Sequence, residues 1–270
     1  MSRNALVTGA ARGIGRAIAL RLARDGFNVA VNDTAMRPLE LNRVRQEIET
    51  IGRKSAAVIA NVSIDKEVKA MMQNVVMVAN AGIAQVKQLI DVTAEEWDNI
   101  FAINMRGVFL CYKEAAKAMI AQGSGGKIIG ACSIVGYKPF SMMSPYSASK
   151  WGVRGLTQAA AMEWAKHKIT VNAYCPGMFH TIFFKIIKYV FAIKTGIVQT
   201  AMWDMIDEEL AKSEGKQKGE VIKDYSNRLI ALGRTSVPED VANFVSYLAS
   251  KDSDYMTGQS IMIDGGIEFS

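Results

Sequence analysis

Short apolar runs alternate with longer amphipathic stretches along most of the chain. The runs with strand character are Ala5–Thr8, Asn28–Asn32, Ala56–Val62, Val75–Ala81, Lys127–Ala131, Thr170–Ala173 and Gln259–Ile263. Helical periodicity covers Gly15–Asp25, Leu39–Ile51, Lys66–Asn74, two stretches around Glu95–Ala121, Ser144–His167 and Pro238–Ala249. Because nearly continuous apolar strands alternate with helices, the pattern predicts right-handed βαβ units and a parallel sheet covered on both faces. The expected fold class is α/β, a single-domain Rossmann-type doubly wound parallel sheet.

We expect one dinucleotide-binding and catalytic domain over residues 1–270, because no linker or repeat interrupts the alternation. Single α/β domains of about 200–250 residues are common, so the length does not require a second domain. One connection is unusually short. Only Ser63–Asn74 remains between the third and fourth predicted strands, which is close to the lower limit of about 10–12 residues for a crossover that includes a helix. Either the helix is short or a local deletion strains the sheet.

Composition and charge argue against several classes of partner. The net charge is +6, but acidic residues lie among the basic ones nearly everywhere, so we expect no nucleic-acid partner. Three cysteines without metal-ligand spacing favour a reduced protein with no metal site. No apolar stretch reaches the ~20 residues of a membrane span, and no signal peptide is visible. The expected location is the cytoplasm, with no membrane partner.

A glycine-rich turn, Thr8–Gly15, directly follows the first predicted strand and opens the first predicted helix. Glycines at such a turn let the backbone approach a pyrophosphate, which then lies at the helix N-terminus. The position after the first strand makes a dinucleotide site the favoured interpretation over a plain strand-to-helix turn. The candidate cofactor-binding residues of this turn are Gly9, Arg12, Gly13, Ile14 and Gly15.

Asp33 ends the second predicted strand, 20 positions beyond Gly13. A carboxylate at this place accepts hydrogen bonds from the adenosine ribose and repels a 2′-phosphate, which favours NAD(H) over NADP(H). Arg12 argues for the opposite preference, because a basic side chain beside the glycines suits that phosphate. We give Asp33 more weight, since Arg12 can point to solvent while a buried mismatch of charge is costly.

Tyr146 and Lys150 are four residues apart in a predicted helix and therefore share one face. An ammonium near a phenol favours the phenolate, so we expect Lys150 to lower the pKa of Tyr146 from about 10 toward that of a general acid/base. Ser133 lies 13 positions before Tyr146, just beyond a predicted strand. Ligands bind at the carboxyl ends of parallel strands, which places Ser133 to hold a substrate oxygen.

These residues resemble the short-chain dehydrogenase/reductase family, whose members carry a Thr-Gly-x-x-x-Gly-x-Gly turn and a Ser/Tyr/Lys active site. The similarity extends over nearly the whole chain. The resemblance implies that Tyr146 donates the proton to a carbonyl during reduction, and that Lys150 holds the nicotinamide ribose and lowers the pKa of Tyr146. Ser133 would fix the substrate oxygen, and Asn104 would hold a water that links Lys150 to solvent. The implied catalytic residues are Asn104, Ser133, Tyr146 and Lys150.

Further cofactor contacts follow from the same resemblance. Asn61-Val62 matches the pair that contacts adenine, which is usually Asp-Val, and Asn80-Ala81-Gly82 matches the motif after the fourth strand. Pro176-Gly177 matches the turn that approaches the nicotinamide. The expected contacts beyond the glycine-rich turn and Asp33 are Asn61, Val62, Asn80, Gly82, Tyr146, Lys150, Pro176, Gly177, Val198 and Thr200.

The distance from Gly177 to Thr200 departs from the family pattern. In the family, a threonine follows Pro-Gly within a few residues. Here Thr200 matches that threonine, but a non-family insert occupies about residues 178–195 before it. The segment is rich in Phe, Ile, Lys and Tyr, which A/T-rich codons specify. Our preferred hypothesis is translated non-coding sequence, such as a retained intron. A substrate lid and an amphipathic helix at a membrane surface are the alternatives.

The later segments, including Ala201-Met202-Trp203 and Tyr255–Ser260, resemble the diacetyl/acetoin reductases and butanediol dehydrogenases. The expected function is NAD(H)-dependent reduction of a small ketone or diketone to the alcohol, or the reverse, by a homotetramer. Met142, Met143 and Trp203 suit a small substrate without strong charge, although each is more often a packing residue. Two alternatives remain: a sugar-alcohol dehydrogenase of the sorbose or xylulose type, and a nucleotide-binding protein whose catalysis the insert impairs.

Overall fold

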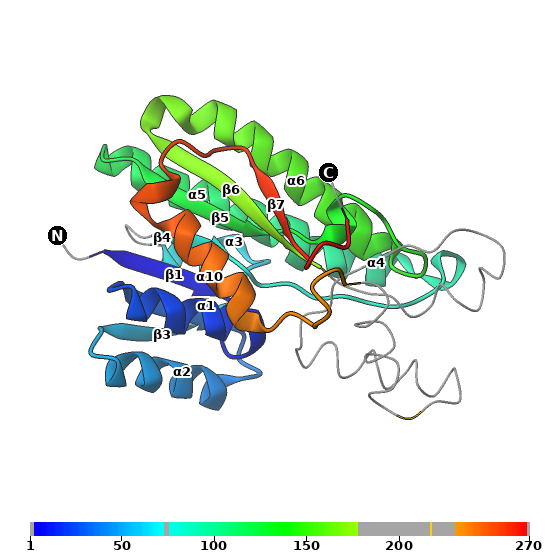
Figure 1. The fold of residues 1–270 in the computed structure, drawn as a ribbon, viewed down its shortest axis with the longest axis horizontal. Coiled ribbons are helices and arrows are strands. Elements are labelled where there is room, and N and C mark those ends of the chain that lie inside the picture. The colour runs from blue at the N-terminus through cyan, green and yellow to red at the C-terminus, as the bar shows by residue number, and fades with distance from the viewer. Residues whose placement is uncertain (1–2, 73–75, 178–216, 218–229, 269–270) are drawn as a thin grey trace.

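Seven parallel strands form one sheet in the order β3-β2-β1-β4-β5-β6-β7 (Figure 1). The computed structural model describes residues 3–72, 76–177, 217 and 230–268. The strands are β1 (Asn4–Thr8), β2 (Asn28–Asp33), β3 (Ser55–Ile59), β4 (Val76–Ala79), β5 (Gly126–Ala131), β6 (Ile169–Pro176) and β7 (Ser260–Ile263). The predicted α/β class with a doubly wound parallel sheet is confirmed.

Helices cover both faces of this sheet (Figure 1). On one face α1 (Gly13–Arg24) packs against α2 (Pro38–Thr50) and α10 (Pro238–Ala249). On the other, α5 (Gly107–Gln122) packs against α3 (Asp65–Met71) and α6 (Ser144–Trp164), and α4 (Ala94–Phe101) packs against α6. Single helical turns at Leu89–Asp91 (η1), Ile134–Gly136 (η3), Ala165–His167 (η4) and Lys251–Ser253 (η5), and a π-helical segment at Ala102–Arg106 (η2), complete the described helices.

Each face of the sheet has its own hydrophobic core. Leu22, Val44 and Val245 belong to the core under α1, α2 and α10. Val68 and Tyr112 belong to the core under α3, α5 and α6. Burial of apolar side chains on both faces explains why the strand sequences read as apolar runs without alternation.

The short crossover between β3 and β4 contains a short helix. β3 ends at Ile59, three residues before the predicted end, and α3 spans seven residues. Asp65 and Glu67 in its first turn favour a helix start, because acidic side chains interact well with the positive end of the helix dipole. β4 still pairs in parallel with both β1 and β5, so the shorter-helix interpretation fits the described residues.

The strand order reverses between β1 and β4. β1 has β2 on one side, reached through α1, and β4 on the other. At such a switch point the connections leave in opposite directions and open a crevice at the carboxyl ends of the strands. The loops after β1, β4, β5 and β6 all begin at these carboxyl ends, and they carry most of the predicted site residues.

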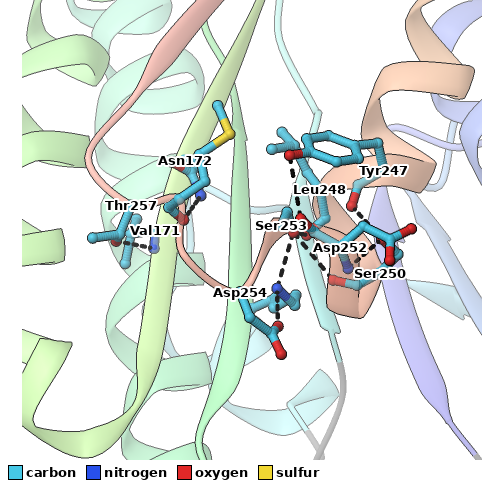
Figure 2. A network of polar contacts seen from close by, with 11 residues as sticks. Val171, Asn172, Tyr247, Leu248, Ser250, Asp252, Ser253, Asp254 and Thr257 are labelled. Carbon is cyan, nitrogen blue, oxygen red and sulfur yellow. Dashed lines mark hydrogen bonds and ion pairs between the residues drawn. The ribbon is translucent and has the colours of Figure 1, made fainter.

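Polar side chains in β6 hold the segment that leads into β7. The Asn172 amide donates to Met256 O (2.7 Å) and accepts from Gln259 N (3.1 Å). Val171 N donates to Thr257 Oγ1 at 3.0 Å. Figure 2 shows Val171 and Asn172 on the strand directed at this segment. Because Asn172 is buried, these bonds satisfy a polar side chain that would otherwise be costly.

A second group of bonds ties the same segment to the end of α10. Ser253 Oγ donates to Leu248 O at 2.8 Å (Figure 2). Lys127, at the start of β5, donates to Ser253 Oγ at 2.9 Å and pairs with Asp254 Oδ1 at 2.8 Å. The Lys127 side chain is only 12% exposed, whereas that of Asp254 is 66% exposed, so the bond to buried Ser253 is less screened by solvent than the ion pair. The polar network therefore lies toward the amino ends of the strands, away from the crevice.

Part of the sequence analysis concerns residues outside this description. The insert at about 178–195, Val198, Thr200 and Trp203 all lie outside the described residues. Among the residues that are described, no helix combines the length and the apolar character needed to cross a membrane. The described residues also hold no cluster of three or more potential metal-ligating His, Cys, Asp or Glu side chains.

Candidate active site

The glycine-rich turn adopts backbone conformations and close approaches that require glycine. Gly9 and Gly13 have φ of +63° and +55°, a region that other L-residues rarely adopt. A Cβ on Gly15 would lie 2.6 Å from Asn80 Nδ2 and 2.9 Å from Gly9 C. Ile14 packs its side chain against the core beneath α1. The first turn of α1 is therefore pressed against the loop, and the first backbone N–H groups of a helix have no acceptor within it, as an anion site requires.

Asn80, just after β4, joins the end of β1 and its loop to strand β6. Its Nδ2 donates to Thr8 O (2.8 Å) and Gly9 O (3.2 Å), and its Oδ1 accepts from the Tyr174 hydroxyl (2.7 Å). Thr8 Oγ1 accepts from the backbone N of Asn80 and of Ala81, both at 3.0 Å. Sequence reasoning assigned no role to Thr8 or Tyr174. Thr8 belongs to the quoted glycine motif, whereas a buried tyrosine within an apolar strand carries no recognisable signal.

Asp33 and Arg12 lie in different environments at the adenosine end. Asp33 is buried, with 9% of its surface exposed. Its carboxylate accepts from Ala11 N (3.1 Å) and Thr34 N (2.9 Å), so the side chain is held between the glycine-rich turn and the end of β2. Arg12 precedes α1 and is exposed. The structure thus places a fixed negative charge in the crevice and the positive charge at its rim.

Asn61 and Val62 follow β3 at the same edge. Ala60 N donates to Asp33 O at 3.1 Å, which keeps this loop beside the end of β2. Val62 is buried against Gly107, where a Cβ would come within 2.9 Å of the valine Cγ2. The predicted strand ended at Val62, but the chain already turns after Ile59 because Asn61 forms local hydrogen bonds with Ser63.

Asn104 projects from a π-helical segment, Ala102–Arg106, between α4 and α5. Single π-helical turns insert an extra residue into a helix and often mark functional sites. Asn104 is fully buried; its Oδ1 accepts from Ile83 N (2.9 Å) and its Nδ2 donates to Ile83 O (2.8 Å) and Ser149 Oγ (3.2 Å). The side chain thereby ties the loop after β4 to α6, the helix that carries Tyr146 and Lys150.

Ser133, Tyr146 and Lys150 meet at the carboxyl end of β5. Ser133 follows β5 in extended conformation, and its hydroxyl lies close enough to the Tyr146 phenol to lower the pKa of that phenol. Lys150 Nζ lies 5.5 Å from the centre of the Tyr146 ring and donates to Ala131 O at 2.8 Å. All three side chains are at least 94% buried. A Cβ on Gly82 would lie 3.6 Å from Lys150 Nζ and 3.3 Å from Asn104 Oδ1, so glycine keeps this side of the ammonium open.

Burial dominates the electrostatics of the pair. It raises the pKa of Tyr146 above its ordinary value, and the nearby Ser133 hydroxyl offsets only part of that rise. Burial also lowers the pKa of Lys150. The prediction that Lys150 lowers the pKa of Tyr146 is therefore wrong for this structure, because removal of the phenol from water outweighs any attraction by the ammonium, which is bonded to the Ala131 carbonyl.

The remaining predicted residues lie at the end of β6 and beside it. Pro176 and Gly177 are buried, and Gly177 N donates to Ile263 O at 3.1 Å. In the loop before α6, Met143 is buried, whereas Met142 is partly exposed with φ +62°. Lys87 N donates to Met142 O at 2.8 Å. The three cysteines are buried and form no disulfide.

These residues fit a nicotinamide dinucleotide. The glycines that a Cβ would crowd leave room for a pyrophosphate at α1. Lys150, a buried ammonium with three donors, has one hydrogen-bond acceptor among the described residues, and therefore retains donors for ribose hydroxyls. Asp33 supplies a fixed carboxylate on the adenosine side.

Comparison with known proteins agrees with this arrangement. Residues 3–188 match the family model described as short chain dehydrogenase, and residues 187–268 match that of enoyl-(acyl carrier protein) reductase. The chain therefore belongs to the short-chain dehydrogenase/reductase family, whose members bind a nicotinamide cofactor, and it is an oxidoreductase of CH–OH donors.

Particular relatives cover essentially the whole chain. It is 42% identical to L-2,3-butanediol dehydrogenase of Corynebacterium glutamicum and 41% identical to diacetyl reductase ((S)-acetoin forming) of Staphylococcus epidermidis, with 100% of each chain covered. A short-chain dehydrogenase/reductase of Armillaria gallica is 46% identical over 99% of this chain and 96% of that protein. The solved structure of acetoin dehydrogenase from Enterobacter cloacae superposes with a TM-score of 0.79 at 29% identity, covering 99% and 96% of the two chains.

Proposed function

We propose that this protein is an NAD(H)-dependent oxidoreductase that reduces a small ketone or diketone, of the diacetyl or acetoin type, to the alcohol, or catalyses the reverse. The observation that carries the proposal is the meeting of Ser133, Tyr146 and Lys150 at the end of β5, with Asn104 bonded to the loop beside them.

Tyr146 is the proposed general acid/base. Because burial raises the pKa of its phenol, the group is protonated at neutral pH and can donate its proton to the carbonyl oxygen during reduction. The Ser133 hydroxyl lies close enough to the phenol to affect its pKa, so a substrate oxygen held between the two hydroxyls can accept one hydrogen bond from each. The bound nicotinamide supplies or accepts the hydride.

Lys150 and Asn104 are proposed to position these groups. Lys150 is anchored through Ala131 O, which leaves two of its donors for a ribose and keeps a positive charge near the reacting oxygen. Asn104 holds the loop after β4 through Ile83 and reaches α6 through Ser149. The family role of Asn104, holding a water that links Lys150 to solvent, remains part of this proposal.

The preference for NAD(H) over NADP(H) is proposed from Asp33. Its carboxylate is fixed by two backbone N–H groups and buried, so it cannot turn away from a 2′-phosphate. The other proposed contacts, whose expected roles come from the family resemblance, are Gly9, Arg12, Gly13, Ile14, Gly15, Asn61, Val62, Asn80, Gly82, Pro176, Gly177, Val198 and Thr200.

The substrate class is proposed from the relatives named for butanediol, diacetyl and acetoin. The two methionines before α6, Met142 partly exposed and Met143 buried, suit a small substrate without strong charge. We also propose a single domain, because no linker or repeat interrupts the alternation of strands and helices, a cytoplasmic location, from the cysteine usage, and assembly as a homotetramer, following the family resemblance.

Turnover with purified protein tests the proposal. Diacetyl and acetoin are mixed with NADH or NADPH, and cofactor oxidation is followed by absorbance for the parent and for Tyr146→Phe. Loss of the phenolic proton should lower kcat by about 10²–10⁴-fold. Tyr247→Phe is the matched control, because that side chain lies on the exposed side of α10 and its hydroxyl bonds only to Asp252 O among the described residues. Tight NADH binding without turnover of any small ketone or sugar alcohol would favour the non-catalytic alternative.

A further inference from the structure

The segment of residues 82–87, which follows β4, lies alongside the start of the catalytic helix α6. At its beginning, a Cβ on Gly82 would come within 3.6 Å of Lys150 Nζ. At its end, Lys87 N donates to Met142 O at 2.8 Å, two residues before α6 begins. The 82–87 segment therefore runs beside the stretch of α6 that carries Tyr146 and Lys150.

The contact at Met142 holds an unusual backbone conformation. Met142 has φ of +62°, and residues other than glycine keep such a conformation only where the surrounding structure imposes it. The hydrogen bond from Lys87 N to Met142 O is a contact of this kind. The next residue, Met143, accepts from Ser147 N in the first turn of α6 at 2.8 Å. The position of Lys87 thus bears directly on the start of the helix that carries Tyr146.

One carboxylate holds the side chain of Lys87. Glu96, in the first turn of α4, accepts from Lys87 Nζ with both oxygens, at 2.9 and 2.8 Å. It also accepts from Gln85 Nε2 at 2.7 Å and from Thr93 N at 2.9 Å. The bond from Lys87 holds the pKa of Glu96 below its ordinary value, so the carboxylate is charged at neutral pH. Glu96 therefore joins the 82–87 segment to the start of α4.

Helix capping does not account for these bonds. Thr93 and Glu96 form a capping box, in which Thr93 Oγ1 accepts from Glu96 N and the Glu96 carboxylate accepts from Thr93 N. A glutamine serves this purpose as well as a glutamate. The bonds from Gln85 and Lys87 come from 11 and 9 residues earlier in the chain and add nothing to the cap.

The two ends of the 82–87 segment are fixed by different residues. Asn104 bonds to both backbone groups of Ile83, next to the position that faces Lys150. Glu96 holds the other end, at Gln85 and Lys87. Release of the second end should therefore disturb the loop before α6 while the side of the segment beside Lys150 stays in place.

We propose that Glu96 is a positioning residue for substrate binding, which holds the 82–87 segment against the loop before α6 through Lys87. Its loss should weaken binding of the ketone and spare the binding of NADH. This inference rests on the proposed function, because it requires a small ketone to bind beside Tyr146. Glu96 acts through Lys87 and takes no part in proton or hydride transfer.

Steady-state kinetics of Glu96→Gln test the inference, since glutamine keeps the cap but offers Lys87 a single uncharged oxygen. The KM for diacetyl should rise by about threefold to tenfold, the effect expected for a partly exposed charged pair. The kcat and the Kd for NADH should stay unchanged. Lys87→Gln should have the same effect, and the double variant should add little, because both substitutions remove one interaction.

Two control variants separate this role from helix stability. Glu95→Gln removes a charge from the same turn of α4, at a side chain that shares no bond with the 82–87 segment among the described residues. Thr93→Ala weakens the cap and should lower Tm by about 2–4 °C, but it keeps the pair of Lys87 and Glu96. Both controls should leave the KM for diacetyl unchanged.

Hydrogen exchange gives a second readout that needs no turnover. The Lys87 amide, which donates to Met142 O, should exchange faster in Glu96→Gln than in the parent or in either control. An active parent whose KM and Lys87 exchange do not change in Glu96→Gln overturns the inference and leaves the proposed function standing. An equal rise of KM in Thr93→Ala also overturns it, because a weakened helix would then suffice. A parent that reduces no small ketone overturns both.

Discussion

Gly15→Ala probes the close approach of α1 to the dinucleotide turn. Alanine normally stabilises a helix interior relative to glycine by about 0.5–1 kcal/mol. At Gly15, however, the new methyl group would lie 2.6 Å from Asn80 Nδ2 and 2.9 Å from Gly9 C, and neither the backbone nor the triply bonded Asn80 can move cheaply. Overpacking of this kind costs about 1–3 kcal/mol. Subtracting the helix preference of about 1 kcal/mol from the upper figure leaves a loss of about 2 kcal/mol in the free energy of unfolding.

Gly155→Ala is the matched control. Gly155 is exposed in the middle of α6, and a Cβ there would have no heavy atom within 4 Å. Alanine at this position should raise the free energy of unfolding by about 1 kcal/mol, the ordinary helix preference of alanine over glycine. For a chain of this size 1 kcal/mol shifts Tm by about 2–4 °C, so the variants should differ in opposite directions from the parent.

Thermal unfolding and NADH titration of both variants measure the effect. Gly15→Ala should melt about 4–8 °C below the parent and bind NADH more weakly, because α1 must withdraw from the turn. Gly155→Ala should melt slightly above the parent with unchanged NADH affinity. Equal stabilisation by both substitutions would refute the close approach of α1 to Gly9 and Asn80.

Three further predictions concern the cofactor, the pH dependence and the insert. Asp33→Asn should raise the kcat/KM ratio of NADPH to NADH by about 10²-fold or more, because a carboxylate about 4 Å from a phosphate opposes it by about 4 kcal/mol per unit charge; an unchanged ratio would count against the NAD(H) preference. The Arg234 guanidinium and Val237 N hydrogen-bond to Asp240 and lower the pKa of its carboxyl in the folded state. That stabilisation is present above the ordinary pKa of about 3.9 and is lost as the pH falls through the lower folded value, so Asp240→Asn should cost about 1 kcal/mol in urea unfolding at neutral pH and progressively less in acid. If the insert is a retained intron, complementary DNA should lack codons for about residues 178–195 that genomic DNA contains; identical spans would sink that hypothesis.

The parallel sheet and the location of the candidate active site could be predicted from the sequence because both depend on local signals. Apolar runs mark strands buried on both faces, and the glycine motif requires backbone conformations that the structure shows at Gly9 and Gly13. The end of β3 was misplaced because Asn61 competes for its own backbone through Ser63, which apolar character does not register. Burial of Tyr146 was also missed, since helix spacing places Lys150 near it but says nothing of how much water the fold removes.

The contacts of Asn80 could not be foreseen for a different reason. The Tyr174 hydroxyl reaches it from β6, 94 positions away along the chain, and only the strand order β4-β5-β6 brings the two residues together. The π-helical turn that aims Asn104 is similarly a product of packing between α4, α5 and α6.

The polar network around Asn172, Ser253 and Lys127 has a consequence for redesign. It fastens the last strand at the edge opposite the crevice, so the anchoring of β7 does not depend on the loops that meet the substrate. Directed evolution of those loops, apart from the glycine-rich turn and Asn80, should therefore leave β7 anchored, whereas a library that also diversifies the Asn172 or Ser253 surroundings should yield mostly insoluble clones. Splitting a library along this boundary would separate changes of selectivity from losses of expression before any activity is measured.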